Sequence, residues 1–231
     1  MSGAQRLRDR SLRMGGFMQK ERGFTLVELL AVMVVLGLLA SLGWPALRAG
    51  FDEAGRMKCA SNLSQLGKGM LMYAADNQMC LPQTMHQADS WTNSLQPYVG
   101  KDLVLTCPCD EVKGRTRTYV MNDYLSAAPC GAEYLSALNL TRLVNVEKPA
   151  RTVFFAELSR THGTKSIPDH LHLAEFDGGD IPPEVFQSYV GVERHGGRAN
   201  YLFLDGHVES LAWSQVKTPH QPTRGPVHRS P

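Results

Sequence analysis

Histidines and one carboxylate are the first residues in this chain whose types and spacing could do chemistry. His170-x-His172 would place two imidazoles on one face of a strand, and with Glu157 they could hold zinc. His162 and His207 could join them. No spacing fixes the distances between these residues, so surface or hydrogen-bonded histidines are the competing interpretation.

A second candidate metal site is the acidic run Glu175-Phe-Asp177-Gly-Gly-Asp180. Its carboxylates could supply oxygen ligands to calcium in a flexible loop. The run does not match an EF-hand, and a solvated acidic loop is the alternative. Asp177 and Asp180 are therefore the candidate calcium ligands, and no other cofactor is expected.

His195 and Asp205 enclose nine residues, and Gly206 follows. Ten residues of extended strand span about 33 Å, so the two side chains cannot meet on a straight strand. Asp-Gly between two strand-like runs is a good hairpin signal, because both central residues must tolerate positive φ. We expect Asp205 to make the turn and His195 to anchor the start of the strand by hydrogen bonds, with a metal or catalytic role as the alternative.

Composition and missing motifs restrict the function classes. The 231 residues are 43% hydrophobic and carry a net charge of +2, which argues against a disordered chain and against nucleic-acid binding. The chain contains no G-x-S-x-G, Walker, H-E-x-x-H or Rossmann pattern. We therefore expect a protein that is not an enzyme.

The amino-terminal part is sorted into a basic and an apolar stretch. Residues 1–23 hold six basic residues against two acidic ones, and residues 24–47 hold one ionisable side chain, Glu28. The apolar run is long enough to span a bilayer as a helix. Since positive charge precedes the span, we expect the amino terminus in the cytoplasm and the bulk of the chain outside.

A removable secretory signal is an alternative for this run. The run is longer than such an apolar region, and Trp44-Pro45 stands where small residues are needed.

Glu28 costs about 2–3 kcal/mol in a bilayer. One interpretation of this carboxylate is that the helix dipole favours it in the first turn. The other interpretation is that it pairs with a cation of another subunit.

Beyond Pro45 the apolar residues recur at steps of three, four and five, which predicts an amphipathic helix over residues 48–77. We expect one helix from about 25 to 76, kinked near Pro45. Residues 78–218 should form the globular part, and the Pro-rich residues 219–231 a disordered tail.

The globular part is expected to hold a short helix over residues 91–98 and a long irregular loop over residues 160–190. Strands are predicted at residues 103–106, 116–122, 152–158, 199–204 and 207–212. The predicted fold class is α+β: a pilin-like long amino-terminal helix, half transmembrane and half amphipathic, packed on a small antiparallel sheet.

That description rests partly on a resemblance carried by Arg22-Gly23-Phe24-Thr-Leu-Val-Glu28-Leu-Leu30. These residues resemble the cleavage and methylation signal of type IV prepilins and type II secretion pseudopilins. The resemblance implies cleavage after Gly23 by a membrane prepilin peptidase and N-methylation of the new amino-terminal Phe24. It also implies that Glu28 neutralises the Phe24 ammonium of a neighbouring subunit during assembly.

A second resemblance concerns the His-x9-Asp-Gly pattern of His195, Asp205 and Gly206. It looks like the carboxy-terminal signature of a large group of prepilin-processed proteins. Four other pieces fit that group: Cys59-Ala-Ser-Asn62-Leu-Ser-Gln-Leu66, Met72-Tyr73-Ala-Ala-Asp76-Asn77, Cys107-Pro108 and the strand ending at Glu157. Because Cys59 and Cys107 fit the pattern, the resemblance implies a disulfide between them, tying the long helix to the globular part.

Other cysteine arrangements stay open. Cys109 with Cys130 is a second possible pair, and one of the five cysteines must remain unpaired in a monomer. The Cys107-Pro-Cys109 spacing resembles a redox site, but no thioredoxin-like pattern surrounds it. Major pseudopilins bind calcium in a carboxy-terminal loop, which is a further reason to consider Asp177 and Asp180.

The resemblances imply a structural subunit that is processed by prepilin peptidase and assembles through its amino-terminal helix into a pilus or secretion pseudopilus. Implied partners are the peptidase/methyltransferase, other pilin-like subunits and an inner-membrane assembly platform. The implied location is the inner membrane, with the globular domain periplasmic or in a surface filament.

Two alternatives remain. One is a membrane-anchored binding or metal-dependent hydrolytic module that uses the signal for delivery, with its metal held among the histidines. The other is a single-pass anchored domain that never assembles.

Overall fold

The computed structural model describes residues 23–84, 90–100, 105–126, 140–164, 167–171, 182–217 and 228–229. The chain divides into two compact units, Met1–Ala46 and Leu47–Pro231. Helix α1, Leu26–Asp76, begins in the first unit and ends in the second. It contains the one run among the described residues that is long and apolar enough to cross a membrane, with a mean hydropathy of 2.4 over 18 residues.

The predicted long helix is present, and it continues through Pro45. In the second unit its buried residues follow the predicted amphipathic steps and include Cys59, Leu63, Leu66 and Met70. The short helix predicted over residues 91–98 is α2, Trp91–Val99, and it contains Pro97. Trp91 and Leu95 anchor α2 in the core.

The second unit contains a five-stranded sheet of order β3-β1-β2-β4-β5. Its strands are β1 (Tyr119–Asn122), β2 (Val153–Glu157), β3 (His170–Leu171), β4 (Arg198–Phe203) and β5 (Val208–Ala212). Strands β1, β2, β4 and β5 are antiparallel neighbours. Strands β1, β2 and β5 lie inside runs that the sequence predicted, and β4 begins one residue before its predicted run. The prediction of a wholly antiparallel sheet is wrong, because β3 pairs parallel to β1.

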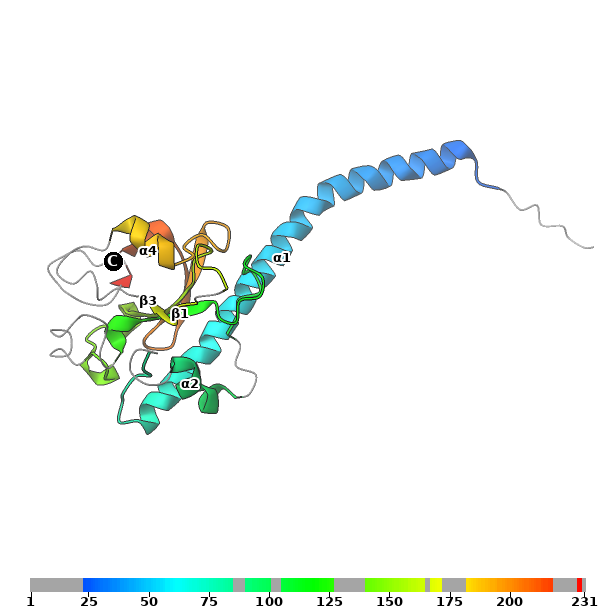
Figure 1. The fold of residues 1–231 in the computed structure, drawn as a ribbon. Coiled ribbons are helices and arrows are strands. Elements are labelled where there is room, and N and C mark those ends of the chain that lie inside the picture. The colour runs from blue at the N-terminus through cyan, green and yellow to red at the C-terminus, as the bar shows by residue number, and fades with distance from the viewer. Residues whose placement is uncertain are drawn as a thin grey trace, which may run out of the picture. The chain divides into compact units, whose positions relative to one another are not determined.

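Both faces of this sheet are covered, which explains why β1 and β2 are buried along their whole length. On one face, α1 and α2 pack through Leu63, Met70 and Trp91 against Tyr119 and Phe155. The other face is covered by helix α4, Pro183–Tyr189, as Figure 1 shows. The fold is therefore α+β, with the sheet between the long helix and a short one.

Residues 160–190 hold more structure than the predicted irregular loop. They contain β3 and α4, although residues 165–166 and 172–181 lie outside the described part of the chain. Similarly, His228–Arg229 forms β7 against β6 (Val216–Lys217) inside the segment expected to be a disordered tail. Of the strand predicted at 103–106, residues 105 and 106 are described and do not form a strand.

Candidate functional site

The amino-terminal end of α1 is closed by a reciprocal cap between Thr25 and Glu28. The Glu28 backbone N–H donates to Thr25 Oγ1 at 3.2 Å. In return, Glu28 Oε2 accepts from the Thr25 N–H at 2.9 Å and from the Thr25 hydroxyl at 2.8 Å. This is a capping box, in which Thr and Glu three residues apart satisfy each other's free donors. Glu28 therefore has a role within its own helix, signalled by the Thr-x-x-Glu spacing, that the sequence analysis missed.

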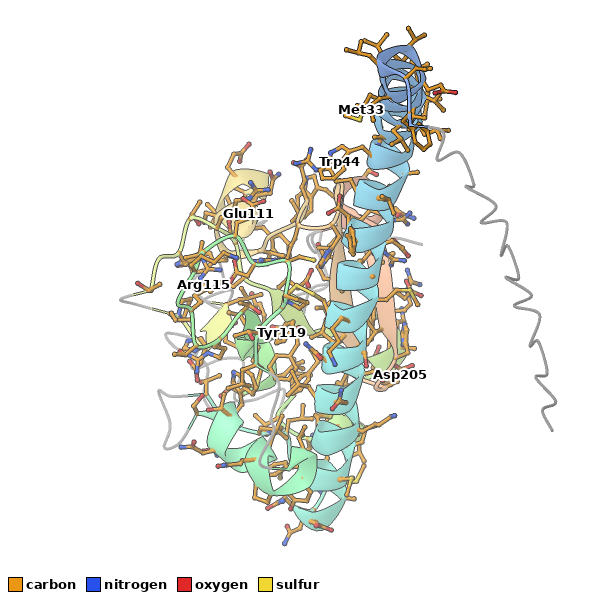
Figure 2. All side chains as sticks on the ribbon, turned by 90° about the vertical axis from the view of Figure 1, so that its right-hand side faces the viewer. Met33, Trp44, Glu111, Arg115, Tyr119 and Asp205 are labelled. Carbon is orange, nitrogen blue, oxygen red and sulfur yellow. A yellow bond between two sulfur atoms is a disulfide. The ribbon has the colours of Figure 1, made fainter. Side chains whose placement is uncertain are left out.

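The residues on either side of the expected cleavage point are accessible in this unit. Gly23 is exposed, and Phe24 has 85% of its surface exposed. Beyond them α1 presents apolar side chains all round, among them Leu26, Leu42 and Trp44. Figure 2 shows Met33 and Trp44 projecting outward from the helix. A helix that is apolar on all sides needs lipid or other apolar helices around it.

His195 is bound to Glu157 at the end of β2, so its predicted role as a hydrogen-bonded anchor has a partner. Its Nε2 lies 2.9 Å from Glu157 Oε1, and both side chains are at most 1% exposed. The second carboxylate oxygen of Glu157 accepts the Asn200 backbone N–H at 3.0 Å. Asn200 Nδ2 then donates to the Arg56 carbonyl of α1 at 3.1 Å. The carboxylate thus links three elements: β2, β4 and, through Asn200, α1.

Several titratable groups surround this buried carboxylate. Burial, and then the Glu157 carboxylate, raise the pKa of Tyr119 and of Tyr201. The same two causes raise the pKa of the Cys109 thiol. All three groups are therefore held in their neutral, protonated forms at neutral pH, which gives none of them the character of an ionised nucleophile or base.

Asp205 and Gly206 form the turn between β4 and β5, where the sequence analysis expected it. The Asp205 carboxylate accepts the His207 backbone N–H at 3.1 Å and contacts the His207 ring. Gly206 has φ of +93°, a conformation that favours glycine. His195 and Asp205 lie at opposite ends of β4 with different partners, so they do not form one site.

The structure joins Cys59 and Cys107, the pair implied by the resemblance, in a disulfide with an S–S distance of 1.98 Å. Cys59 lies on α1, and Cys107 lies in the loop before β1. Cys80 and Cys109 are free. Cys130, the alternative partner of Cys109, lies outside the described residues. The sulfur atoms of the disulfide, Cys109 Sγ and a His195 ring nitrogen all lie within 4.8 Å of one another.

The histidine sites considered from the sequence are not assembled in the described part of the chain. His170 Nδ1 is 2.6 Å from the Asp169 carboxylate, and the His162 ring packs against Tyr189 at 5.1 Å between centroids. His172 and the candidate calcium ligands, Asp177 and Asp180, lie outside the described residues. Among the ranges described above, the cysteine–His195 group is the only convergent set of three or more His, Cys or acidic residues.

A buried ion-pair network next to this group was not found from the sequence. Arg115 Nη1 lies 3.1 Å from Asp110 Oδ2, and Arg194 Nη1 lies 2.9 Å from Asp110 Oδ1. Arg115, labelled in Figure 2, also donates to the carbonyl of Ser159 at 2.8 Å. The network pins the Cys109–Asp110 loop to the segment after β2. Asp110 and Arg115 are only five residues apart, but Arg194 is distant in the sequence, and no spacing signals that it joins them.

Comparison with known proteins places a family motif on the amino-terminal segment. The family described as "Prokaryotic N-terminal methylation motif" matches residues 18–44. This range includes Gly23, Phe24 and the capping box.

The relatives are type II secretion proteins. The chain is 47% identical over 60 residues to the "Type II secretion system core protein G" of Klebsiella pneumoniae, covering 26% of this chain and 43% of the relative. It is 40% identical over 78 residues to the protein of that name from Aeromonas hydrophila, covering 33% and 54%. With the protein of that name from Vibrio cholerae the identity is 37% over 62 residues, covering 27% and 42%.

The chain thus spans about half, or less, of the length of these relatives. No solved structure matches it significantly. The methylation motif, the apolar helix that follows it and the identity to core protein G agree with one another. The chain is a pseudopilin-like protein with an α+β fold.

Proposed function

We propose that this protein is a structural subunit of a pilin-like secretion assembly, with its amino-terminal helix as the assembly element. The observation that carries the proposal is the methylation motif at residues 18–44, which coincides with a helix whose apolar side chains are exposed on all sides. Such a helix requires an apolar environment. Lipid supplies it before assembly, and the helices of other subunits supply it afterwards.

Processing follows from the same segment. The precursor spans the inner membrane once, with its amino terminus in the cytoplasm and its globular domain outside, because the basic residues precede the span. Prepilin peptidase cuts after Gly23, and Phe24 becomes the methylated amino terminus. Removal of residues 1–23 avoids a free-energy cost, since their six basic residues would otherwise have to enter the bilayer when the subunit is extracted.

Glu28 serves both the helix and the contact with the next subunit. Its Oε2 holds the capping box, while its Oε1 makes no hydrogen bond within the described residues. A carboxylate fixed in this way presents one oxygen to a cation without having to be ordered first. In an assembly that cation is the Phe24 ammonium of a neighbouring subunit, and pairing offsets the desolvation of both charges.

The globular domain has a structural role in this proposal. Its partners are other pilin-like subunits and an assembly platform in the inner membrane, and the identity to core protein G favours a type II secretion pseudopilus over a pilus.

Amino-terminal mass spectrometry of protein from native membranes tests the processing step. A peptide that begins at Phe24 with one added methyl group is the expected result. An intact precursor terminus, or a start beyond Pro45, would contradict the proposal.

Two matched variants separate the two roles of Glu28 during assembly. Glu28→Gln keeps a capping-box acceptor but removes the charge, whereas Thr25→Ala removes the cap and keeps the charge. We expect both to be processed, and only Glu28→Gln to lose crosslinked subunit ladders in membranes. Ladders that survive in Glu28→Gln but vanish in Thr25→Ala would show that the cap, and not the pairing, matters.

A further inference from the structure

We propose that Cys59, Cys107, Cys109 and His195 form a zinc site when the Cys59–Cys107 disulfide is reduced. Their ligand atoms, three sulfurs and one ring nitrogen, all lie within 4.8 Å of one another. Three Cys and one His are a donor set typical of closed, tetrahedral structural zinc sites. The disulfide and the metal site are two alternative states of one cluster.

The distances are close to those that a tetrahedral ion requires. Zn–S bonds of about 2.3 Å and Zn–N bonds of about 2.0 Å place neighbouring ligand atoms roughly 3.5–3.8 Å apart. His195 Nε2 already lies 3.8 Å from Cys107 Sγ. The two disulfide sulfurs must separate from 1.98 Å, and the widest pair must close from at most 4.8 Å. Each change is about 1–2 Å, within reach of side-chain rotation.

The surroundings leave room for the third sulfur and a route to it. A side chain at Gly55 of α1 would place its Cβ 2.4 Å from Cys109 Sγ, so the glycine makes space for this thiol. Cys109 also lines an open cavity of about 360 Å³, together with Ser159, Gly191 and Arg194. The cavity gives an ion a path from solvent as far as Cys109, one of the four ligands.

Conversion of the disulfide state into the zinc-bound state balances in electrons and protons. A dithiol reductant supplies two electrons and two protons, which convert the disulfide into two thiols while the reductant itself becomes a disulfide. Zn²⁺ then displaces the protons of the three cysteine thiols. His195 Nε2 binds as a neutral imidazole nitrogen, so its proton moves to Nδ1 and its hydrogen bond to Glu157 is given up. Glu157 keeps its bond to the Asn200 N–H and faces the ion.

Both states tie α1 to the loop before β1. Cys59 belongs to α1, Cys107 and Cys109 to the loop before β1, and His195 to the turn before β4. The disulfide joins only the first two elements, whereas a metal ion would join all three. The protein would therefore keep its long helix attached to the sheet under oxidising and reducing conditions alike.

Metal titration of the full chain in detergent micelles tests the proposal. One sample is kept oxidised, and the other is reduced by a phosphine without oxygen and freed of reductant. Co²⁺ is the probe, since thiolate ligation gives near-ultraviolet charge-transfer bands and tetrahedral geometry gives visible bands. We expect one Co²⁺ per reduced chain, displaced by one Zn²⁺, and none in the oxidised chain.

Three variants show whether these residues hold the ion. Cys109→Ser and His195→Gln should each weaken binding by more than the roughly 10- to 100-fold that loss of an outer partner costs. Cys80→Ser is the matched control, because Cys80 is free but lies outside the cluster, and it should bind as the unaltered chain does.

Three results would overturn the proposal: no tetrahedral signal in the reduced chain, unchanged affinity in Cys109→Ser and His195→Gln, or loss of binding in Cys80→Ser. If reduction alone unfolds the chain, Zn²⁺ must restore the emission of the buried Trp91 in the unaltered protein and not in Cys109→Ser. Failure of this restoration would equally refute the site.

Discussion

The Cys59–Cys107 disulfide should contribute about 4 kcal/mol to the stability of the globular unit. The bond joins residues 48 apart in sequence. Closing a loop of that size in the unfolded chain removes an entropy worth about 4 kcal/mol at 25 °C. The effect acts on the unfolded state, and so it does not depend on local contacts at the bond.

The perturbation must prevent Cys109 from replacing a lost partner, because its sulfur lies in the same cluster. The comparison is therefore Cys109→Ser, which keeps the disulfide, against Cys59→Ala/Cys109→Ser, which cannot form it. Urea unfolding of the full chain in detergent, with a zinc chelator present, measures the difference. Tryptophan emission reports the transition, since Trp91, one of the three tryptophans, is buried against Phe155 and becomes exposed on unfolding.

A control separates the crosslink from the loss of the Cys59 side chain. Under reducing conditions neither variant has the disulfide, and the remaining difference is the cost of truncating a buried residue. Subtracting it should leave about 4 kcal/mol. A net value under about 1 kcal/mol, the size of an ordinary substitution effect, would refute the entropic reasoning.

Two further predictions concern the same unit. Gly206→Ala should destabilise it by about 1–2 kcal/mol in urea unfolding, because φ is +93° there and the new Cβ would lie 2.8 Å from Leu71 Cδ1. Gly163→Ala, with open space at its Cβ, should change little, and equal effects would contradict this reasoning. Burial lowers the pKa of His162. Below about pH 6.5 the unfolded chain then binds more protons than the folded chain, so the free energy of unfolding should decrease as the pH is lowered in that range. His162→Asn should make this decrease smaller. An unchanged slope of unfolding free energy against pH would rule out this residue as the cause.

The elements that the sequence predicted are those with strong local signals. The apolar run and the amphipathic steps after it predict α1, and the Asp-Gly turn predicts the β4–β5 hairpin. The parallel strand β3 has only two residues, His170 and Leu171, and pairs with residues 49 positions earlier. A pairing this short and this distant leaves no periodic pattern, and therefore the mixed character of the sheet was not predictable.

In the candidate site, too, features with a local sequence signal were predictable, and contacts between distant residues were not. The sequence predicted that His195 would be an anchoring residue, but it could not identify Glu157 as its partner, since the register of β2 against β4 brings them together. The same holds for Cys109, whose approach to the disulfide depends on the path of its loop along α1. By contrast, the Thr25–Glu28 cap is signalled by local spacing alone, because Thr and Glu three residues apart at a helix start form a capping box.

The nine residues between His195 and Asp205 measure the length of one strand with its turn. His195 binds Glu157 at one end of β4, and Gly206 turns the chain at the other. The same stretch contacts α1 at two points. Asn200 donates to a carbonyl of the helix, and a Cβ at Gly67 of α1 would lie 3.2 Å from the Gly206 carbonyl oxygen. We propose that the spacing of the signature serves to dock the sheet on the long helix, because it places the Glu157 contact and the Gly206 turn one strand apart.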